Sequence, residues 1–391
     1  MRLATIAEDL TSATDGTAAF GQRGWAVEVL LRWRLSNAEA DVVSIDTDSR
    51  ATSMGDAVNR VRDAAHLLRS APVLVKQFDS TLRGHVVAEC MAALREGDRS
   101  RLIVVAAFPS AGRTTMGGIQ QLDGVQLERT SFGRDPVNPV SCSDLVVMFR
   151  EGSLDVSLAR TADEARLQAI DHEVVVVDAA DESDIDGVIA AVGEQSTMLW
   201  AGSTGLLRGM ARGWGEATRP SSTVPPAQPS SLSALIVVGS INPVSRTQVA
   251  FVEAAGWSVI RIDSPDGVAA AVDAATHSAA TRTPLCLTTA ESRTDPSTAM
   301  NYLTSAAVAA LQTQCFDGLV ATGGETARRI ANRLGASALV VVREIEPGIP
   351  LCLLRVGTRL LPLITKAGGF GSPEFLATVG SRLSVGVQDD L

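Results

Sequence analysis

The residues Ala321-Thr322-Gly323-Gly324-Glu325-Thr326 follow an apolar run at 318–320 and lead directly into a helix-like stretch at 327–334. A buried strand, two glycines and a helix in this order bring bare backbone N–H groups and the positive end of a helix to one point. A phosphate binds well at such a point. Many α/β proteins use the same order only for a tight turn, so this stretch alone predicts a strand–turn–helix joint and leaves phosphate binding open.

Two similar joints occur in the same half of the chain. The segment Lys366-Ala367-Gly368-Gly369-Phe370-Gly371 follows an apolar run at 360–365 and precedes a helix-like stretch at 373–383. Another apolar run, at 234–238, leads into Gly239-Ser240. Open α/β sheets bind their ligands at the carboxyl ends of strands. The three loops together therefore predict one nucleotide site.

Composition restricts the class of protein. The chain has 391 residues, of which 46% are hydrophobic and 20% charged, enough for two globular domains. A formal charge of −10 without any Lys/Arg-rich run argues against a nucleic-acid partner. No apolar run approaches the roughly 20 residues that cross a bilayer, and the acidic Glu8-Asp9 comes too early for a signal peptide. We expect no membrane association and a cytoplasmic location.

The cysteines and histidines give no sign of a metal site. The five cysteines are scattered and form no C-x-x-C pair, and the four histidines show no ligand spacing. We expect buried free thiols and neither zinc nor a disulfide framework.

Strand-like and helix-like segments alternate in the first half. Strands are expected at 3–7, 26–31, 41–45, 72–76, 101–107 and 173–177, and helices at 54–68, 86–94, 144–150, 162–170 and 185–192. Residues 199–206 are expected to form the last strand and a loop. Asp123-Gly124 predicts a β-hairpin over 120–127, with a flap and a dimer contact as its two candidate roles. The alternation predicts a mostly parallel sheet flanked by helices.

A proline- and serine-rich segment at 216–233 predicts a linker between two domains, residues 1–215 and 234–391. The predicted fold is therefore α/β, with two domains that each contain a mostly parallel sheet flanked by helices, and with the active site in the cleft between them.

Charged and hydroxyl residues gather after the strands of the first domain: Asp9, Asp15, Asp46, Asp48, Arg50, Lys76, Asp79, Ser80, Arg83, Arg113, Arg134 and Asp135. Arginine and lysine bind carboxylates, and aspartates accept hydroxyl protons. Helix caps are also rich in aspartate, serine and arginine, so capping is the alternative role for each of these residues. Thr11 or Ser12 is the candidate cap of the first helix. The sequence Asp79-Ser80-Thr81 is expected to open a helix with Arg83 in its first turn, where an arginine opposes the helix dipole unless an anion lies nearby. A nucleotide half and a hydroxy-acid half together predict phosphoryl transfer onto a hydroxy acid.

At this point the sequence resembles the four-carbon acid sugar kinases over nearly its whole length. The motifs that carry the resemblance, in chain order, are Ile6-Ala7-Glu8-Asp9-Leu10-Thr11, Asp46-Thr47-Asp48-Ser49-Arg50, Lys76 with Asp79-Ser80-Thr81-Leu82-Arg83-Gly84, Phe108-Pro109 with Gly112-Arg113-Thr114-Thr115, Arg134-Asp135-Pro136 with Asn138-Pro139-Val140, Gly239-Ser240, Thr322-Gly323-Gly324-Glu325-Thr326, Glu344-Ile345-Glu346-Pro347-Gly348-Ile349-Pro350, and Lys366 with Gly368-Gly369-Phe370-Gly371.

The resemblance implies an N-terminal domain that binds a sugar acid of the threonate or erythronate type and a C-terminal domain that binds ATP, in carbohydrate catabolism. It implies substrate contacts from Asp9, Lys76, Asp79 and Arg83, to which the strand-end residues Asp15, Ser80 and Arg113 are added. The ATP contacts that it implies are Ser240, Thr322, Gly323, Gly324, Glu325, Thr326, Gly368 and Gly369.

A mechanism follows as a hypothesis. Arg83 and Lys76 hold the substrate carboxylate or neutralise the transferred charge, Asp79 or Asp9 deprotonates the hydroxyl, and Mg²⁺ bridges the ATP phosphates. Glu325 and Glu346 are candidates to orient Mg²⁺ through water, with loop stabilisation as the alternative for Glu346. No residue is assigned as a direct metal ligand.

Two departures from the family pattern bear on the substrate. Glu8 and Ser12 replace the usual Asp and Gly of the first motif, and His85 replaces the usual Asn after Arg83-Gly84. Two alternatives stay open: a kinase of a different polyol or oxo-acid, and a sensor of ATP or a sugar acid that releases no ADP.

Overall fold

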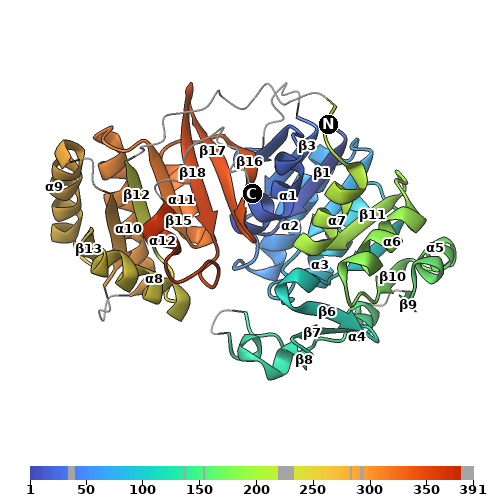
Figure 1. Ribbon diagram of the computed structural model, residues 1–391. Coiled ribbons are helices and arrows are strands. Elements are labelled where there is room, and N and C mark those ends of the chain that lie inside the picture. Colours follow the sequence, from blue (N-terminus) through green and yellow to red (C-terminus); the bar gives the residue numbers. More distant parts are fainter. Residues whose placement is uncertain are drawn as a thin grey trace. The chain divides into compact units, whose positions relative to one another are not determined.

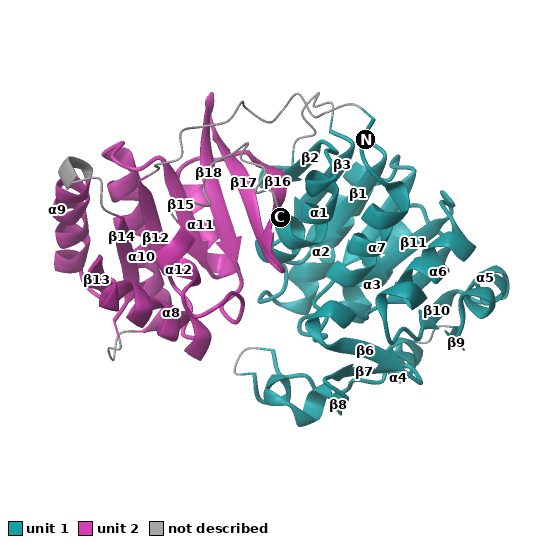
Figure 2. Ribbon diagram, viewed as in Figure 1, with its two compact units in different colours: residues 1–220 teal, residues 221–391 magenta. Residues whose placement is uncertain are grey.

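The computed structural model describes residues 1–33, 40–135, 138–152, 155–218, 233–281, 284–290 and 295–379. The chain divides into two units, Met1–Pro220 and Ser221–Leu391, which Figure 2 shows in teal and magenta. Most of the predicted linker, residues 219–232, lies outside the described residues.

The sheet of unit 1 consists of strands paired in the order β2-β3-β1-β4-β11-β5-β10-β9, and all of its described pairs are parallel (Figure 1). The strands are β1 (Leu3–Ala7), β2 (Val27–Leu30), β3 (Val42–Asp46), β4 (Val73–Gln77), β5 (Arg101–Val105), β9 (Val156–Ala159), β10 (Val174–Val177) and β11 (Met198–Gly202). They are buried along nearly their whole length, because helices cover both faces of a parallel sheet.

The helices of unit 1 are α1 (Leu10–Gln22), α2 (Met54–Leu68), α3 (Val86–Glu96), α4 (Leu145–Glu151), α5 (Ala162–Asp171), α6 (Glu182–Val192) and α7 (Thr204–Trp214). Helix α1 contacts α7, α7 contacts α6 and α6 contacts α5, while α2 contacts α3. Right-handed crossovers place α1, α5, α6 and α7 on one face of the sheet, and α2 and α3 on the other. The carboxyl ends of the strands consequently share one edge.

A smaller sheet, β6-β7-β8, follows β5. It comprises β6 (Arg113–Met116), β7 (Ile119–Leu122) and β8 (Val125–Gln126), with short 3₁₀ turns at Pro109–Ala111, Leu127–Arg129 and Ser131–Arg134. Asp123 and Gly124 both have positive φ, so the predicted hairpin is confirmed. The buried Gln120 side chain ties this sheet to the main body by donating to the carbonyls of Ser80 (2.9 Å) and Ala106 (3.0 Å).

Unit 2 contains strands in the order β13-β14-β12-β15-β18-β17-β16. These are β12 (Ala234–Val238), β13 (Ser258–Ile262), β14 (Leu285–Thr289), β15 (Gly318–Thr322), β16 (Ala338–Glu346), β17 (Ile349–Val356) and β18 (Arg359–Lys366). Pairing is parallel from β13 to β18 and antiparallel across β18-β17-β16. The two glycine-bearing loops after β15 and β18 therefore lie at the same edge, as does the loop after β12.

The helices of unit 2 are α8 (Pro243–Ala254), α9 (Pro265–Thr281), α10 (Pro296–Gln312), α11 (Gly324–Arg333) and α12 (Phe375–Thr378). Helices α8 and α12 pack together over a core that contains Val320 and Ile364, and α10 contacts both α9 and α11. The mostly parallel α/β fold predicted for both halves is confirmed.

Four local predictions were wrong. Asp9, rather than Thr11 or Ser12, caps α1, and its carboxylate accepts the Ser12 N–H at 2.7 Å. Residues 204–206 begin α7 instead of forming a loop. Helix α12 covers only Phe375–Thr378 of the helix predicted over 373–383, of which residues 380–383 lie outside the described residues.

The fourth correction concerns the segment after β4. Helix α3 begins at Val86, so Asp79-Ser80-Thr81 does not open it and Arg83 precedes its first turn. Leu82 and Gly84 have positive φ (59° and 90°), which makes the segment a tight non-helical turn. Arg83 therefore lies outside the first turn of α3, and the helix dipole gives no reason to expect an anion beside it.

Candidate functional site

Arg50 is the centre of a polar cluster at the carboxyl ends of β1, β3 and β4. Its guanidinium pairs with Glu8 Oε1 at 2.6 Å and with Asp9 Oδ2 at 2.5 Å. It also donates to Ser12 Oγ at 3.1 Å. The segments after β1 and β3 are thus joined by one arginine, because the two strands are adjacent and parallel.

A second part of the cluster follows β4. Arg83 Nε lies 2.5 Å from Asp79 Oδ2, which also accepts the Thr81 hydroxyl at 2.6 Å. The Arg83 guanidinium approaches Asp135 at 3.5 Å and lies over the Phe132 ring. Burial favours the neutral form of Asp79, but Arg83 and Arg50 outweigh it and hold the pKa of this carboxyl well below its usual range.

Beneath these residues lies a buried charge network. Lys76 Nζ is 2.9 Å from Glu89 Oε2, and both side chains are almost completely inaccessible to solvent. Burial raises the pKa of Glu8 to about 7, although Arg50 and Lys76 act in the opposite direction. Within the described residues, Glu8 Oε2 is buried without a hydrogen-bond partner. The site therefore contains one carboxylate, Asp79, that stays ionised and another, Glu8, that titrates near neutral pH.

The remaining residues predicted to bind substrate lie around this cluster. Asp15 belongs to α1 rather than to a strand end, and its Oδ2 accepts the Thr204 hydroxyl at 3.1 Å. Ser80 lies in the turn after β4 and its carbonyl accepts a bond from Gln120. Arg113 starts β6, and its Nε is buried without a hydrogen-bond partner among the described residues. An arginine with a spare buried donor is suited to bind a carboxylate.

In unit 2 the residues predicted to bind ATP meet at the ends of β12, β15 and β18. Gly323 has φ of 101° and precedes the first turn of α11, where Gly324, Glu325 and Thr326 lie. A Cβ on Gly239 would come within 2.2 Å of Thr326 Oγ1, and one on Gly368 within 2.1 Å of Ser240 Oγ. Glycine is required where these loops approach so closely.

Side chains of α8 form hydrogen bonds with the backbone of the glycine loop after β18. The buried Gln248 side chain donates to the carbonyls of Phe370 (3.1 Å), Gly371 (3.2 Å) and Ser372 (2.8 Å). Ser245 Oγ donates to the Gly368 carbonyl at 2.6 Å. These bonds occupy carbonyls of the loop, and of its N–H groups that of Phe370 donates to the Ala367 carbonyl at 3.2 Å.

Two residues outside the predicted sites are part of these clusters. Arg50 joins Glu8 to Asp9, and Lys366 is buried at the end of β18 directly before the glycine loop. Lys76 and Lys366 are the only lysines in the sequence. That rarity, together with the position of each at the end of an apolar run, is the signal that could have selected Lys366.

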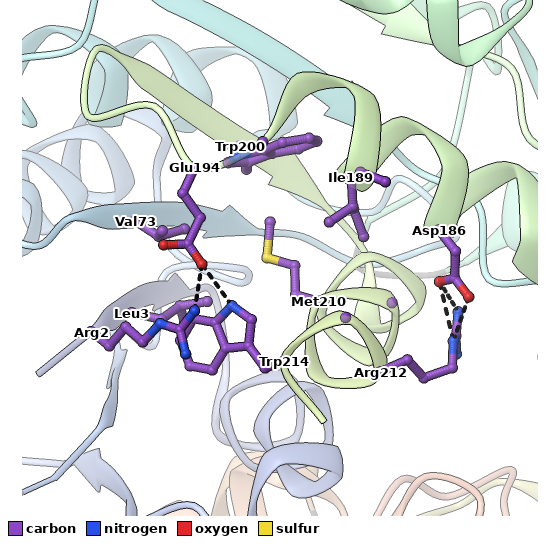
Figure 3. Close-up of a pocket in the computed structure, with 14 residues that line it drawn as sticks. Arg2, Leu3, Val73, Asp186, Ile189, Glu194, Trp200, Met210, Arg212 and Trp214 are labelled. Atoms are coloured by element: carbon purple, nitrogen blue, oxygen red, sulfur yellow. Dashed lines mark hydrogen bonds and ion pairs between the residues drawn. The ribbon is translucent and has the colours of Figure 1, made fainter. Parts of the chain in front are cut away.

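A cavity of about 490 Å³ lies at the opposite end of the unit 1 sheet, beside Leu3 and Val73 at the amino ends of β1 and β4. In Figure 3, Glu194 bridges Arg2 and Trp214, and Asp186 faces Arg212. The two ion pairs, Arg2–Glu194 and Arg212–Asp186, measure 2.8 and 2.7 Å. With its charges paired and its walls largely apolar, this cavity is separate from the polar cluster.

The described residues contain no group of three or more His, Cys, Asp or Glu side chains that could hold a metal ion. In the described part of the chain, no helix is long and apolar enough to cross a membrane. The five cysteines are free thiols, of which Cys90, Cys286 and Cys352 are buried.

Comparison with known proteins assigns a class to each unit. A family model described as a sugar-binding N-terminal domain matches residues 3–210, and one described as a nucleotide-binding C-terminal domain matches residues 235–376. The two matches together define a class of two-unit α/β proteins with a sugar-binding N-terminal domain and a nucleotide-binding C-terminal domain.

Curated relatives narrow the class. The chain is 33% identical to a D-threonate kinase of Bordetella bronchiseptica and 34% identical to one of Cupriavidus necator, with 95% of each chain covered in both cases. It is 29% identical to a 3-oxo-tetronate kinase of Methylobacterium radiotolerans, over 96% of this chain and 97% of that one. The chain belongs to the four-carbon acid sugar kinase family and is a sugar-acid kinase.

Solved structures agree with the fold. A Salmonella typhimurium protein superimposes with a TM-score of 0.80 at 19% identity, covering 96% of this chain and 98% of that one. A Bordetella bronchiseptica protein, 28% identical, matches with a TM-score of 0.50 over 98% of both chains, and its structure is a domain-swapped dimer with bound citrate.

Proposed function

We propose that this kinase transfers the terminal phosphate of ATP to a hydroxyl of a four-carbon sugar acid, with D-threonate as the first candidate. The observation that carries the proposal is the cluster around Arg50 and Asp79, where arginines and carboxylates from three strand ends meet. Guanidinium groups recognise the acid, and ionised aspartates accept a hydroxyl hydrogen bond. The curated D-threonate kinases among its relatives support this choice.

In this proposal Arg83 and Arg113 bind the substrate carboxylate. Arg113 has a buried Nε without a partner among the described residues, and the Arg83 guanidinium is partly accessible. The Lys76 ammonium is already paired with Glu89, so its role is to position Glu89 and Glu8 and not to contact the acid. Asp15 and Ser80 line the same region, in the first helix and in the turn after β4.

The hydroxyl is positioned by Asp79 or Asp9. Asp79 is kept ionised by Arg83 and Arg50, so it accepts a hydroxyl hydrogen bond at every working pH. A strongly paired carboxylate is a weak base. That is sufficient for phosphoryl transfer through a loose transition state, in which positioning contributes more than proton removal. Asp9 is the alternative base, and it forms an ion pair with Arg50 at 2.5 Å.

The donor lies in unit 2, against Ser240, residues 322–326 and the Gly368-Gly369 turn. Mg²⁺ accompanies the nucleotide and supplies charge neutralisation across its phosphates. The described residues offer no cage of acidic ligands, so the ion would be held mainly by phosphate and water. Glu325, which is exposed and paired with Arg329 at 2.6 Å, can orient a water of that ion.

The test is ADP release from ATP·Mg²⁺ across the D and L forms of threonate and erythronate, with 3-oxo-tetronate included. The variants Asp79→Asn and Asp9→Asn should each bind ATP as the parent does, and the one that removes the base should lower kcat by about 10²–10⁴-fold. Asp63→Asn, on the exposed side of α2, is the matched control and should leave kcat unchanged. An unchanged kcat in both site variants would contradict the assignment of the base to Asp79 or Asp9. The absence of ADP release with every acid would contradict the substrate class.

A homodimer is part of the same proposal. The related Bordetella structure is a dimer, and the hairpin at Asp123-Gly124 presents the exposed side chain of Val125. Light scattering on the purified chain should give twice the 40.8 kDa of one chain. A mass of one chain at micromolar concentration would remove the dimer from the proposal and leave the kinase assignment intact.

A further inference from the structure

The ends of β15 and β18 place Thr322 beside Lys366. The two residues are register partners in a parallel pair, and the Gly323 N–H donates to the Lys366 carbonyl at 2.8 Å. Side chains alternate along a strand, so Thr322 shares a face with Val320 and Lys366 with Ile364. Val320 and Ile364 belong to the same core cluster. The ammonium and the hydroxyl therefore end on one face, next to the start of α11.

Both polar groups are buried with unused bonding capacity. Lys366 is 0% exposed, and among the described residues its ammonium donates only to the Ala367 carbonyl, at 3.2 Å. Thr322 is also 0% exposed, and its Oγ1 has no hydrogen-bond partner among the described residues. An ammonium has three donors and a hydroxyl has one. A buried ammonium without a counter-charge is costly, so its retention calls for a ligand that supplies the charge.

In the described part of the chain, no charged side chain contributes to the pKa of Lys366. Several charged groups on nearby elements have other partners. Arg246 on α8 donates to Thr288 and Thr289, Glu253 on α8 pairs with Arg261, Glu325 on α11 pairs with Arg329, and Glu344 on β16 accepts the Gly348 N–H. Burial is accordingly the cause that lowers the pKa of Lys366, to about 8.

We propose that Lys366 and Thr322 form the floor of the nucleotide site and contact a phosphate of bound ATP, which supplies the counter-charge that the ammonium lacks within the protein. This inference rests on the proposed function, adds Lys366 to its ATP site and gives the side chain of Thr322 a specific role there. Above the floor are the N-terminus of α11 and the backbone of the Gly368-Gly369 turn, which together surround an anion with donors.

A proton linkage follows from the same geometry. A phosphate beside Lys366 favours its charged form, so ATP binding returns the pKa toward its ordinary value of 10.5. Above about pH 8 the free protein holds the amine largely neutral and the complex holds it charged, so binding takes up a proton. ATP affinity should therefore fall by up to tenfold for each pH unit above 8, in a range where the phosphates themselves are fully ionised.

The first test uses the variant Lys366→Met in the full chain. Without nucleotide its melting temperature should equal or exceed that of the parent, because an unpaired buried charge has been removed. Calorimetry with ATP·Mg²⁺ should show a dissociation constant raised by about 10–100-fold, and Thr322→Val a smaller rise. Lys366→Arg keeps the charge and should keep part of the affinity. ATP affinity equal to the parent's in Lys366→Met would overturn the inference.

The second test needs no variant. With only two lysines in the chain, protein labelled with ¹³C at lysine Cε gives two lysine signals. One signal should titrate near pH 8 in the free protein and at least one unit higher with saturating ATP, while the paired Lys76 stays charged throughout. A midpoint that ATP does not move would overturn the inference.

Failure of the inference is distinguishable from failure of the proposed function. If the parent binds ATP and phosphorylates a sugar acid while Lys366→Met does so equally well, only the inference fails. If the parent neither binds ATP nor releases ADP with any acid of the panel, the proposed function fails as well.

Discussion

The two lysines of this chain occupy equivalent positions in the two units and have opposite surroundings. Lys366 is the last residue of β18 and Lys76 the last but one of β4, and each is 0% exposed. Lys76 lies 2.9 Å from Glu89, so that Glu89 and Glu8 outweigh burial and raise its pKa, whereas burial lowers the pKa of Lys366 to about 8. The buried lysine of unit 1 thus has a carboxylate partner within the protein, whereas the buried lysine of unit 2 is left for the charge of a ligand.

The largest effect expected from this comparison is on stability. Lys76→Met should lower the free energy of unfolding of unit 1 by about 3–5 kcal/mol, because it leaves Glu89 buried without its counter-charge. Urea unfolding, followed by tryptophan fluorescence, measures the change; four of the five tryptophans lie in unit 1. Lys366→Met, a chemically identical substitution, should cause no loss.

A double variant provides the control. Replacing Glu89 by Leu as well as Lys76 by Met removes both charges, so most of the lost stability should return. Equal losses from Lys76→Met and Lys366→Met would break the comparison, since they would show that the two ammonium groups contribute alike.

An intermediate effect is expected in the loop that Lys366 precedes. A Cβ on Gly368 would lie 2.1 Å from Ser240 Oγ and 3.0 Å from Ser240 Cβ, so Gly368→Ala must push the two loops apart. Overpacking of this kind costs about 1–3 kcal/mol, and we expect a KM for ATP about tenfold higher with little change in the KM for the acid. Steady-state kinetics with each substrate varied in turn separates the two constants.

Gly369→Ala is the matched control for that loop. Its Cβ would lie 3.5 Å from Asn242 Nδ2, an ordinary contact, so the KM for ATP should stay within about twofold of the parent value. Similar kinetics for both alanine variants would argue against close approach of Ser240 and Gly368 in the active enzyme.

The smallest effect concerns the pH dependence of unit 1. Burial raises the pKa of Glu8 from 4.5 to about 7, so between these values the folded chain holds a proton that the unfolded chain has released. Stability should therefore decrease as pH rises through this window, with a slope below about 1.4 kcal/mol per pH unit. Urea midpoints at half-unit intervals measure the slope, which should flatten in Glu8→Gln. An unchanged slope in that variant would assign the proton to another group.

Much of the fold could be predicted from the sequence because its signals are local. Continuous apolar runs marked the buried parallel strands, and Asp123-Gly124 marked the hairpin. The errors arose where a local signal had two interpretations. Gly205 resembled a loop residue but begins α7, where a Cβ would lie 2.3 Å from the Ala107 carbonyl oxygen, so the glycine serves close packing. The turn at Leu82 depends on a positive φ that leucine rarely adopts.

The site was predictable only as a set of strand ends. Which charges pair depends on contacts between segments distant in the chain, such as Arg50 with Glu8, 42 residues apart, and no local pattern specifies them. The same reason explains why Lys366 received no predicted role. Its importance lies in the partner that it lacks, which only the packing around it reveals.

Because both lysines are buried, proteolysis at each of them can report local unfolding of the unit that contains it. A lysine-specific protease finds no accessible site in the folded protein, because Lys76 and Lys366 are enclosed in separate units. Cleavage after Lys76 would record opening of the sugar-binding unit, and cleavage after Lys366 opening of the nucleotide-binding unit. The order in which fragments 1–76 and 367–391 appear would then show which half of the enzyme yields first, and whether each substrate protects only its own half.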